Sequence, residues 1–152
     1  MRLLWIIFLI SVDAVAQSNE ELVKVQVPNA SARPGREGLI KILVSVKTGY
    51  HIQAHRIKDD LLIPTTLEIE GDTSFKITNQ VFPPAKQFAL TGTDQSLEVY
   101  DGDFEIQTSL RLSRRIQKGF RQVKGRLNYQ ACDSVRCLFP RTVEFPVNIE
   151  VQ

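Results

Sequence analysis

The sequence predicts an all-β sandwich. Apolar and polar residues alternate along many short segments, and turn residues separate these segments from one another. No window of helical length shows a sustained apolar stripe with a period of 3.6 residues. Seven or eight short strands of this kind are typical of two antiparallel sheets packed face to face. With 152 residues, the chain is long enough for one domain with a core of its own.

The clearest strand segments have aliphatic residues at every second position, which is the pattern of a strand with one buried face. Residues 31–36 have the composition of a loop, and residues 50–64 are the least regular part of the chain. Prolines exclude residues 81–84 from a central strand, so we expect an edge or loop there, with Phe82 buried. Strands are expected at residues 23–27, 40–47, 65–70, 104–113, 123–129 and 143–151.

The N-terminal residues predict export. Arg2 precedes an apolar run over residues 3–10, and Ala14-Val15-Ala16 fits a small-x-small cleavage site. We therefore expect a signal peptide at residues 1–16 and one mature domain at residues 17–152. The alternative is an uncleaved membrane anchor, although the apolar run is shorter than the roughly 20 residues that span a bilayer. After cleavage, no stretch is apolar enough to cross a membrane.

Composition excludes few functions. The formal charge of +2 is too small to indicate a nucleic-acid partner, and no phosphate loop, nucleophile elbow or paired-carboxylate site is recognisable. One basic run is a candidate surface for an acidic partner or an anionic membrane, but it equally fits the solvated face of two strands and their connection. The run consists of Arg111, Arg114, Arg115, Lys118, Arg121, Lys124 and Arg126.

The only two cysteines, Cys132 and Cys137, lie between two predicted strands with four residues separating them. A four-residue connection suits a hairpin, which would bring the Cα atoms within the roughly 4.4–6.8 Å that a disulfide needs. Alternation along the preceding strand places Cys132 on the outer face, at a strand end. A loop this small stabilises a fold by about 2 kcal/mol, and a sandwich of this size can fold without it. The pair is therefore either an inert bond or a redox-active one.

Metal binding is a weaker alternative. His51 and His55 could join the two cysteines in a four-ligand zinc set, but the histidines are not on a recognisable helix and exported thiols tend to oxidise. The prediction therefore includes no metal and no cofactor.

The residues around the cysteines carry a more specific signal. Residues 125–140 read Gly-x-Leu-x-Tyr-Gln-Ala-Cys-Asp-x-x-x-Cys-Leu-x-Pro. Residues 49–54 (Gly-Tyr-His-Ile-Gln-Ala), 62–65 (Leu-Ile-Pro-Thr) and 99–102 (Val-Tyr-Asp-Gly) belong to the same pattern. Over nearly all of the predicted mature chain, these segments resemble the N-terminal periplasmic domain of the thiol:disulfide interchange protein DsbD.

This resemblance implies an immunoglobulin-like fold in the periplasm that relays electrons by thiol–disulfide exchange. It implies that Cys137 engages partners and that Cys132 resolves the mixed disulfide. The sequence contains neither the family's membrane domain nor its thioredoxin-like domain, so we expect the donor to be a separate thioredoxin-like protein or a DsbD-type membrane protein. The acceptors would be periplasmic proteins that contain disulfides.

Side chains near the pair have candidate roles. Arg136 could favour a thiolate and Asp133 could oppose one, although both also fit an ordinary exposed loop. Tyr129 and Phe139 either frame the site or simply pack in the fold. In the family, an aromatic residue on a cap loop shields the cysteines. The corresponding stretch here is residues 90–100, whose tip at residues 93–96 has no aromatic residue, which leaves Leu97 or Tyr100 as substitutes.

The sequence thus predicts an exported thiol–disulfide oxidoreductase of the protein-disulfide reductase type, acting through Cys132 and Cys137. The alternative function is a non-catalytic β-sandwich binding module with a structural hairpin disulfide. The two functions differ in redox behaviour, because an inert structural bond resists reduction.

Overall fold

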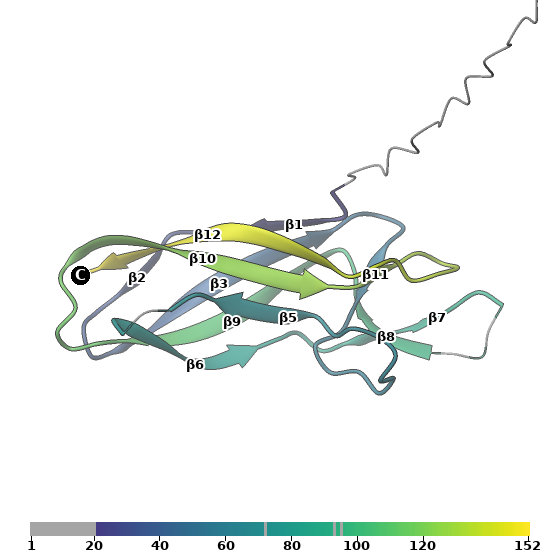
Figure 1. The fold of residues 1–152 in the computed structure, drawn as a ribbon, viewed down its shortest axis with the longest axis horizontal. Helices are drawn as coiled ribbons and strands as arrows, with labels where there is room; N and C mark the ends of the chain where they lie inside the picture. The colour runs from purple at the N-terminus through teal and green to yellow at the C-terminus, as the bar shows by residue number, and fades with distance from the viewer. Residues whose placement is uncertain (1–20, 72, 93, 95) are drawn as a thin grey trace, which may run out of the picture.

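The computed structural model describes residues 21–71, 73–92, 94 and 96–152. Two four-stranded sheets form a sandwich, and a third four-stranded sheet lies at one end of it (Figure 1). The described part of the chain contains no helix, and hence none that is long and apolar enough to cross a membrane. The all-β, immunoglobulin-like sandwich predicted from the sequence is therefore confirmed. The predicted signal peptide at residues 1–16, and the mature start at Gln17, lie outside the described residues.

The first sheet has the strand order β1-β3-β9-β6, with every pair antiparallel. Alternating side chains of its two long central strands are buried, as the aliphatic pattern requires. The predicted strands at residues 23–27, 40–47 and 104–113 correspond to β1, β3 and β9. The bounds are Val23–Gln26 for β1, Glu37–Val46 for β3, Asp103–Leu112 for β9 and Phe75–Val81 for β6.

The second sheet has the order β2-β12-β10-β5, and only its β2–β12 pair is parallel. A long antiparallel ladder between β10 and β12 includes the pair Gly125 and Phe145. A Cβ atom at Gly125 would lie 2.2 Å from Cε2 of Phe145, so the absence of a side chain lets this ring lie across the neighbouring strand. The bounds are Ala30–Ala32 for β2, Arg141–Val151 for β12, Gly119–Tyr129 for β10 and Thr66–Ile69 for β5.

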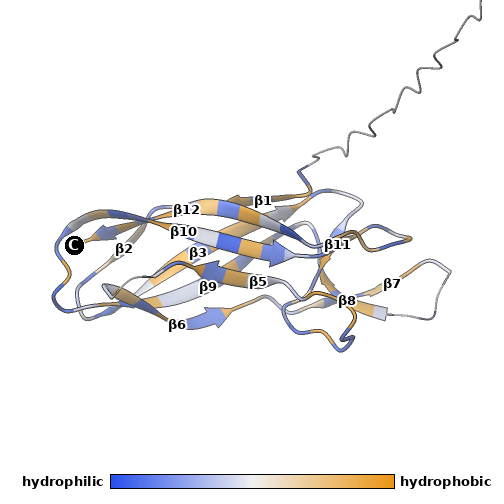
Figure 2. Ribbon diagram, viewed as in Figure 1, coloured by the Kyte–Doolittle hydropathy of each residue, from blue (hydrophilic) through white to orange (hydrophobic). Residues whose placement is uncertain are grey.

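The main core lies between these two sheets, where their inward aliphatic residues meet. Hydrophobic and hydrophilic residues alternate along β10 and β12 in Figure 2. Ile42 and Ile106 come from the first sheet, Leu127 and Val147 from the second, and all four are fully or almost fully buried. Burial of this apolar area is the dominant favourable contribution to folding, so the sandwich does not depend on any cross-link between its sheets.

The third sheet, with the order β11-β4-β8-β7, is built at one end of the sandwich from short strands. Strand β11 follows β10 after one intervening residue, Gln130, and pairs with β4. Strands β7 and β8 form a hairpin whose second strand pairs with β4. The bounds are Ala131–Cys132 for β11, His51–Gln53 for β4, Ser96–Tyr100 for β8 and Lys86–Ala89 for β7.

Several of these strands were not expected from the sequence. Strand β2 overlaps the start of the loop predicted at residues 31–36, and β4 lies in the segment that looked irregular. All three residues of β4 are buried, so their sequence shows no alternation, and β2 is only three residues long. Strand β6 contains a register shift between Ile77 and Asn79, which breaks the period of two. Phe82 follows this edge strand, as expected, but its side chain is only partly buried, whereas a buried one was predicted.

Candidate functional site

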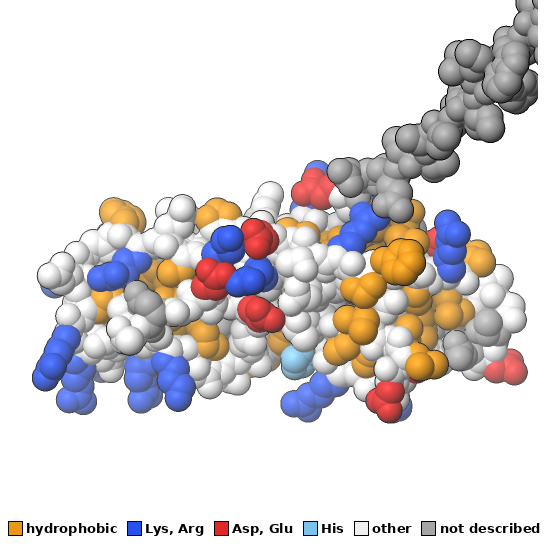
Figure 3. Space-filling model, in the orientation of Figure 1, with side chains coloured by type: hydrophobic (Ala, Val, Ile, Leu, Met, Phe, Trp, Pro, Cys, Tyr) orange, Lys and Arg blue, Asp and Glu red, His pale blue; other side chains and the backbone are white. Residues whose placement is uncertain are grey.

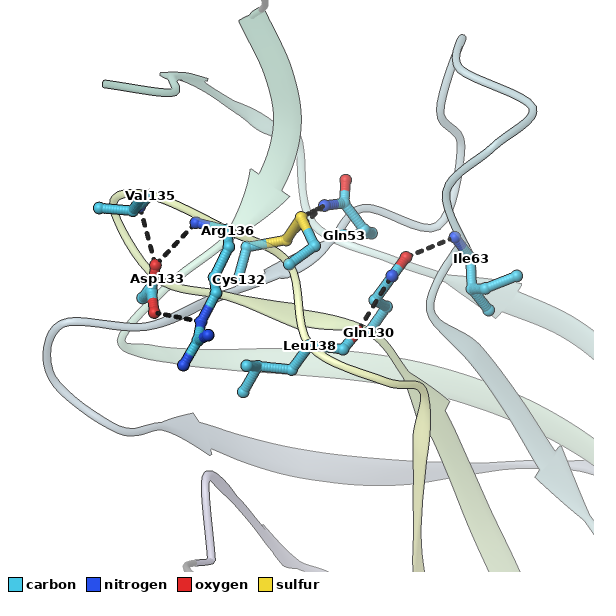
Figure 4. Close-up of a disulfide and its surroundings, with 9 residues drawn as sticks. Gln53, Ile63, Gln130, Cys132, Asp133, Val135, Arg136 and Leu138 are labelled. Atoms are coloured by element: carbon cyan, nitrogen blue, oxygen red, sulfur yellow. Dashed lines mark hydrogen bonds and ion pairs between the residues drawn. A yellow bond between two sulfur atoms is a disulfide. The ribbon is translucent and has the colours of Figure 1, made fainter. Parts of the chain in front are cut away.

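Cys132 and Cys137 form a disulfide (Figure 4). It lies at the end of the molecule where Figure 1 shows β11, in the third sheet. The two residues pair across an isolated antiparallel bridge, so the predicted hairpin arrangement is confirmed. Their Cα atoms are 3.9 Å apart. The expected range of roughly 4.4–6.8 Å was therefore wrong, because the two residues lie directly opposite each other in a very tight turn.

The two cysteines differ in exposure. Cys132 has an exposed fraction of 0%, whereas Cys137 is partly exposed. The prediction that Cys132 lies on the outer face was wrong. Alternation applies only within one strand, and the chain leaves β10 at Gln130 before Cys132 joins the third sheet through β11. Of the two cysteines, Cys137 is thus the one with solvent-exposed surface.

A small apolar cluster, separate from the main core, surrounds the disulfide. Leu97 and Val99 are its buried members beside Cys132, and Phe88 packs against them from β7. The β7–β8 hairpin thus covers the disulfide. The expected substitute Leu97 belongs to this cluster, but Tyr100 does not: it packs in the main core and accepts a hydrogen bond from the His55 backbone N–H. The aromatic residue that packs over the disulfide cluster is Phe88. It lies two residues before the cap-loop stretch at residues 90–100 that the sequence indicated.

The loop between the cysteines is held by Asp133. One carboxylate oxygen of Asp133 accepts hydrogen bonds from the backbone N–H groups of Val135 and Arg136, both at 2.8 Å. These bonds lower the pKa of Asp133, since they stabilise the ionised carboxylate. The backbone N–H of Thr91 donates to the Ser134 carbonyl at 3.1 Å, which joins the hairpin to the loop. Asp133 therefore fixes the loop shape, which the sequence reading did not foresee.

Two buried polar residues of β4 lie beside the disulfide: Gln53, which was not expected at the site, and His51, which was considered from the sequence only as a possible metal ligand. The side-chain amide nitrogen of Gln53 lies 3.0 Å from Sγ of Cys132, and His51 pairs with Cys132 across the β4–β11 ladder. Both belong to the Gly-Tyr-His-Ile-Gln-Ala segment that carried the family resemblance. Polar residues inside an otherwise buried strand were the signal that could have identified them.

Burial also affects the ionisation of His51. Desolvation lowers its pKa, because the charged imidazolium loses more hydration than the neutral ring. The carboxylates of Asp101 and Asp133 act in the opposite direction, but more weakly. The buried Nε2 atom of His51 has no hydrogen-bond partner among the described residues. Burial therefore favours the neutral form of the His51 ring.

The other candidate residues occupy different places. Tyr129 is buried in the main core, so the structure gives it a packing position. Phe139 has an exposed fraction of 88%, and Arg136 is exposed with its Nε atom 4.0 Å from the Asp133 carboxylate. A groove of about 720 Å³ lies beside the disulfide. It is lined by Cys137 together with Gln130, Arg136, Leu138, Phe139, Pro140 and Arg141.

The two histidines do not meet at the cysteines. His55 stacks on Phe82 with ring centroids 4.0 Å apart, and its Nδ1 atom forms a hydrogen bond with the Thr65 carbonyl. Among the described residues, no group of three or more His, Cys, Asp or Glu side chains could hold a metal ion. The four-ligand set considered from the sequence is therefore not assembled in this structure.

The basic run lies mainly around the β9–β10 connection, at the opposite end of β10 from the disulfide (Figure 1). Hydrophobic side chains gather at the disulfide end of the face shown in Figure 3, and Lys and Arg side chains gather at the other end. The basic run is thus not part of the disulfide site. Among the described residues, three of its members form ion pairs: Arg111 with Glu37, Lys124 with Glu144, and Arg126 with Glu70.

Fold and site together define a class: an immunoglobulin-like sandwich that carries a partly exposed disulfide at one end. The family model for the N-terminal region of the thiol:disulfide interchange protein DsbD matches residues 15–149. The chain therefore belongs to this family of thiol–disulfide exchange domains.

Solved structures are similar in fold. The N-terminal periplasmic domain of ScsB from Proteus mirabilis matches with a TM-score of 0.59 and 13% identity, over 90% of this chain and 49% of that chain. This chain thus spans about half the length of the ScsB chain. A chain in a cohesin–dockerin complex from Clostridium thermocellum matches with a TM-score of 0.41 and 14% identity, over 87% of this chain and all of that chain. No curated protein sequence matches.

Proposed function

We propose that this domain relays electrons by exchanging its Cys132–Cys137 disulfide with the thiols and disulfides of other proteins. One observation carries the proposal beyond family membership: the two cysteines are unequal in exposure. Cys137 is partly exposed and lines a surface groove, whereas Cys132 is fully buried beneath the β7–β8 hairpin. Such asymmetry suits a reaction in which one sulfur meets the partner and the other resolves the intermediate.

The oxidised domain would receive electrons in two exchange steps. A thiolate of a reduced donor attacks Sγ of Cys137, the Cys132–Cys137 bond breaks, and its electron pair goes to Sγ of Cys132. The donor's second thiolate then attacks the donor sulfur of the mixed disulfide, which releases Cys137. The domain has gained two electrons and, with two protons from solvent, holds two thiols, while the donor has become a disulfide.

The reduced domain would pass these electrons on in the reverse order. The Cys137 thiolate attacks a sulfur of the acceptor's disulfide and forms a mixed disulfide, releasing the acceptor's other sulfur as a thiolate. The Cys132 thiolate then attacks Cys137, which re-forms the intramolecular disulfide and releases the reduced acceptor. The short loop between the cysteines keeps the resolving sulfur next to the mixed disulfide.

The partners follow from this chemistry. The donor would be a thioredoxin-like protein or a DsbD-type membrane protein, and the acceptors would be disulfide-containing proteins of the periplasm. Residues 1–16 would act as a cleaved signal peptide that delivers the domain starting at Gln17 to that compartment. Similarity to domains described as periplasmic supports this location. The exposed Phe139 side chain and Arg136, at the groove beside Cys137, offer an apolar and basic contact surface to such partners.

Trapping of the mixed disulfide tests the proposal. The Cys132→Ala variant lacks the resolving thiol, so its Cys137 thiol should displace thionitrobenzoate from the single remaining cysteine of a thioredoxin-like protein whose second cysteine is replaced. The resulting covalent complex should persist until dithiothreitol reduces it. The matched Cys137→Ala variant retains only the buried sulfur and should trap far less. Absence of a complex with Cys132→Ala, or equal trapping by both variants, would contradict the proposed roles.

A further inference from the structure

The side chain of Gln53 lies against the disulfide in a fixed position. Its Nε2 atom is 3.0 Å from Sγ of Cys132 and 3.7 Å from Sγ of Cys137. The exposed fraction of Gln53 is 0%. Its backbone N–H donates to the Gln130 carbonyl at 3.1 Å, and its carbonyl accepts a hydrogen bond from the Thr65 hydroxyl. Because both backbone groups are bonded, β4 holds this amide next to the sulfur atoms.

The orientation of the amide follows from the sulfur chemistry. A disulfide sulfur carries no hydrogen and can only accept a hydrogen bond, so the NH₂ end of Gln53 faces it. The Oε1 atom points away from the disulfide in Figure 4 and has no hydrogen-bond partner among the described residues. Burying an amide oxygen without a partner is unfavourable. The fold thus keeps a buried amide whose oxygen has no partner at a position where its N–H reaches the sulfur of Cys132.

Exchange creates a charge on that same atom. When a partner thiolate bonds to Sγ of Cys137, the electron pair of the broken S–S bond goes to Sγ of Cys132. Cys132 is fully buried beside Leu97 and Val99, and apolar burial disfavours a thiolate. Within the described residues, Gln53 is the side chain that donates to this sulfur. A hydrogen bond to a charged acceptor is about twice as strong as one to a neutral acceptor, so this contact strengthens as the charge develops.

We propose that Gln53 is a catalytic residue whose side-chain N–H stabilises the leaving thiolate of Cys132 during exchange. This inference rests on the proposed exchange function. The same contact acts in the reverse direction, because it favours the thiolate form of Cys132, which is the form that attacks the mixed disulfide at Cys137. Gln53 therefore lowers the barrier in both directions without itself gaining or losing a proton.

Substitution of Gln53 by methionine tests this role, because methionine has a similar length and shape but no N–H group. In a Cys137→Ala background, where Cys132 is the only thiol, Gln53→Met should lower the fraction of Cys132 thiolate at neutral pH about tenfold. Ultraviolet absorbance of the thiolate, recorded as a function of pH, measures this fraction. Gln53→Glu, which offers a carboxylate in place of the N–H, should lower it further.

Gln80→Met is the matched control. Gln80 is a partly buried glutamine, less buried than Gln53, and its amide donates to the Leu67 carbonyl, away from the disulfide. With both cysteines present, Gln53→Met should slow reduction by a reduced thioredoxin-like protein about tenfold, whereas Gln80→Met should leave the rate unchanged. If the Cys132 thiolate fraction is the same in Cys137→Ala proteins with and without Gln53→Met, the inference is overturned.

Two further results keep the test decisive. If Gln53→Met and Gln53→Glu fail to fold, the side-chain NH₂ resonances of Gln53 in the Cys137→Ala protein should still shift with pH as Cys132 ionises. Resonances that do not follow this ionisation would overturn the inference. If the protein without substitutions is not reduced by thioredoxin-like proteins at all, the exchange function fails and this inference fails with it. If the protein without substitutions is reduced normally but Gln53→Met leaves the Cys132 thiolate fraction unchanged, the exchange function stands and only the role of Gln53 is contradicted.

Discussion

The imidazole ring of His51 packs against the phenyl ring of Phe88, with ring centroids 3.9 Å apart and planes inclined by 36°. His51 lies on β4 and pairs with Cys132, whereas Phe88 lies on β7 and packs in the cluster around the same cysteine. These two rings join the covering hairpin to the strand beside the disulfide, so changes in either ring should affect access to the sulfur atoms.

Removal of the Phe88 ring should open the site. Phe88→Ala leaves the disulfide and its loop in place but removes the aromatic cover, so reduction by dithiothreitol should become roughly fivefold faster because access partly limits exchange. The measurement is the rate of disulfide loss, followed by alkylation and mass. The control Phe120→Ala removes an exposed ring far along β10, and its rate should match that of the unsubstituted protein. A Phe88→Ala rate equal to that of the control would show that this ring does not cover the site.

His51 should make stability depend on pH in a defined window. Burial lowers its pKa in the folded protein, whereas the unfolded chain has the ordinary value of 6.5. Between these two values the unfolded state binds more protons, so the free energy of unfolding should fall as the pH drops below about 6.5 and level off below the folded-state pKa. Above about pH 6.5 the His51 ring is neutral in both states, and its burial causes no pH-dependent loss of stability.

Urea unfolding of the unsubstituted protein and of His51→Gln, over the range from about pH 7 to about pH 5, measures this slope. The free energy of unfolding of His51→Gln should depend less on pH over this range. Asp133 acts in a lower window: its pKa is lowered from the ordinary 3.8, so the stability it contributes is present above about 3.8 and is lost as the pH falls from there through the lowered value. Equal slopes for the two proteins would mean that His51 does not carry the effect.

The disulfide should contribute little to stability. It closes a short loop in a cluster separate from the main core, so its reduction should lower the free energy of unfolding by about 2 kcal/mol. The reduced protein should unfold in one cooperative transition with an unchanged dependence on denaturant, because the sandwich core remains. Urea unfolding with and without reductant measures both quantities. A reduced protein that is largely unfolded would instead indicate a structural bond.

The contact between Gly125 and Phe145 should be sensitive to any side chain. Gly125→Ala places a Cβ atom much closer to the Phe145 ring than a van der Waals contact allows. The ring must therefore move, which should lower the free energy of unfolding by about 1–3 kcal/mol. Combining this change with Phe145→Leu should cost less than the sum of the two single changes, since the smaller side chain leaves room. Thermal unfolding of the four proteins gives the coupling energy, and additive effects would contradict this contact.

The sequence predicted those parts of the molecule in which one strand has one buried face. Alternation identified β3, β9, β10 and β12, whose pattern of burial repeats every two residues. It did not identify β4, since all three residues there are buried, and it placed Cys132 on the wrong face because a break at Gln130 cannot be read from alternation.

The site was only partly predictable. Its two sulfur atoms are evident from composition, because the chain has no other cysteine. Gln53 and Phe88 approach them from β4 and β7, and these contacts result from strand pairing in the third sheet, which joins segments far apart in the chain. Tyr100 matched the family pattern, but its side chain turns into the main core. Local sequence specifies the chemistry of a residue, whereas the pairing of short strands decides what it contacts.

The most direct test of the exchange function is the reduction potential of the Cys132–Cys137 disulfide. Equilibration of the protein with thiol buffers of known potential, followed by alkylation and mass measurement, gives this value. An electron relay requires a potential above about −300 mV, in the range of thioredoxin-like proteins that would exchange with it. A value below about −300 mV would mark an inert structural bond and would contradict the proposed function.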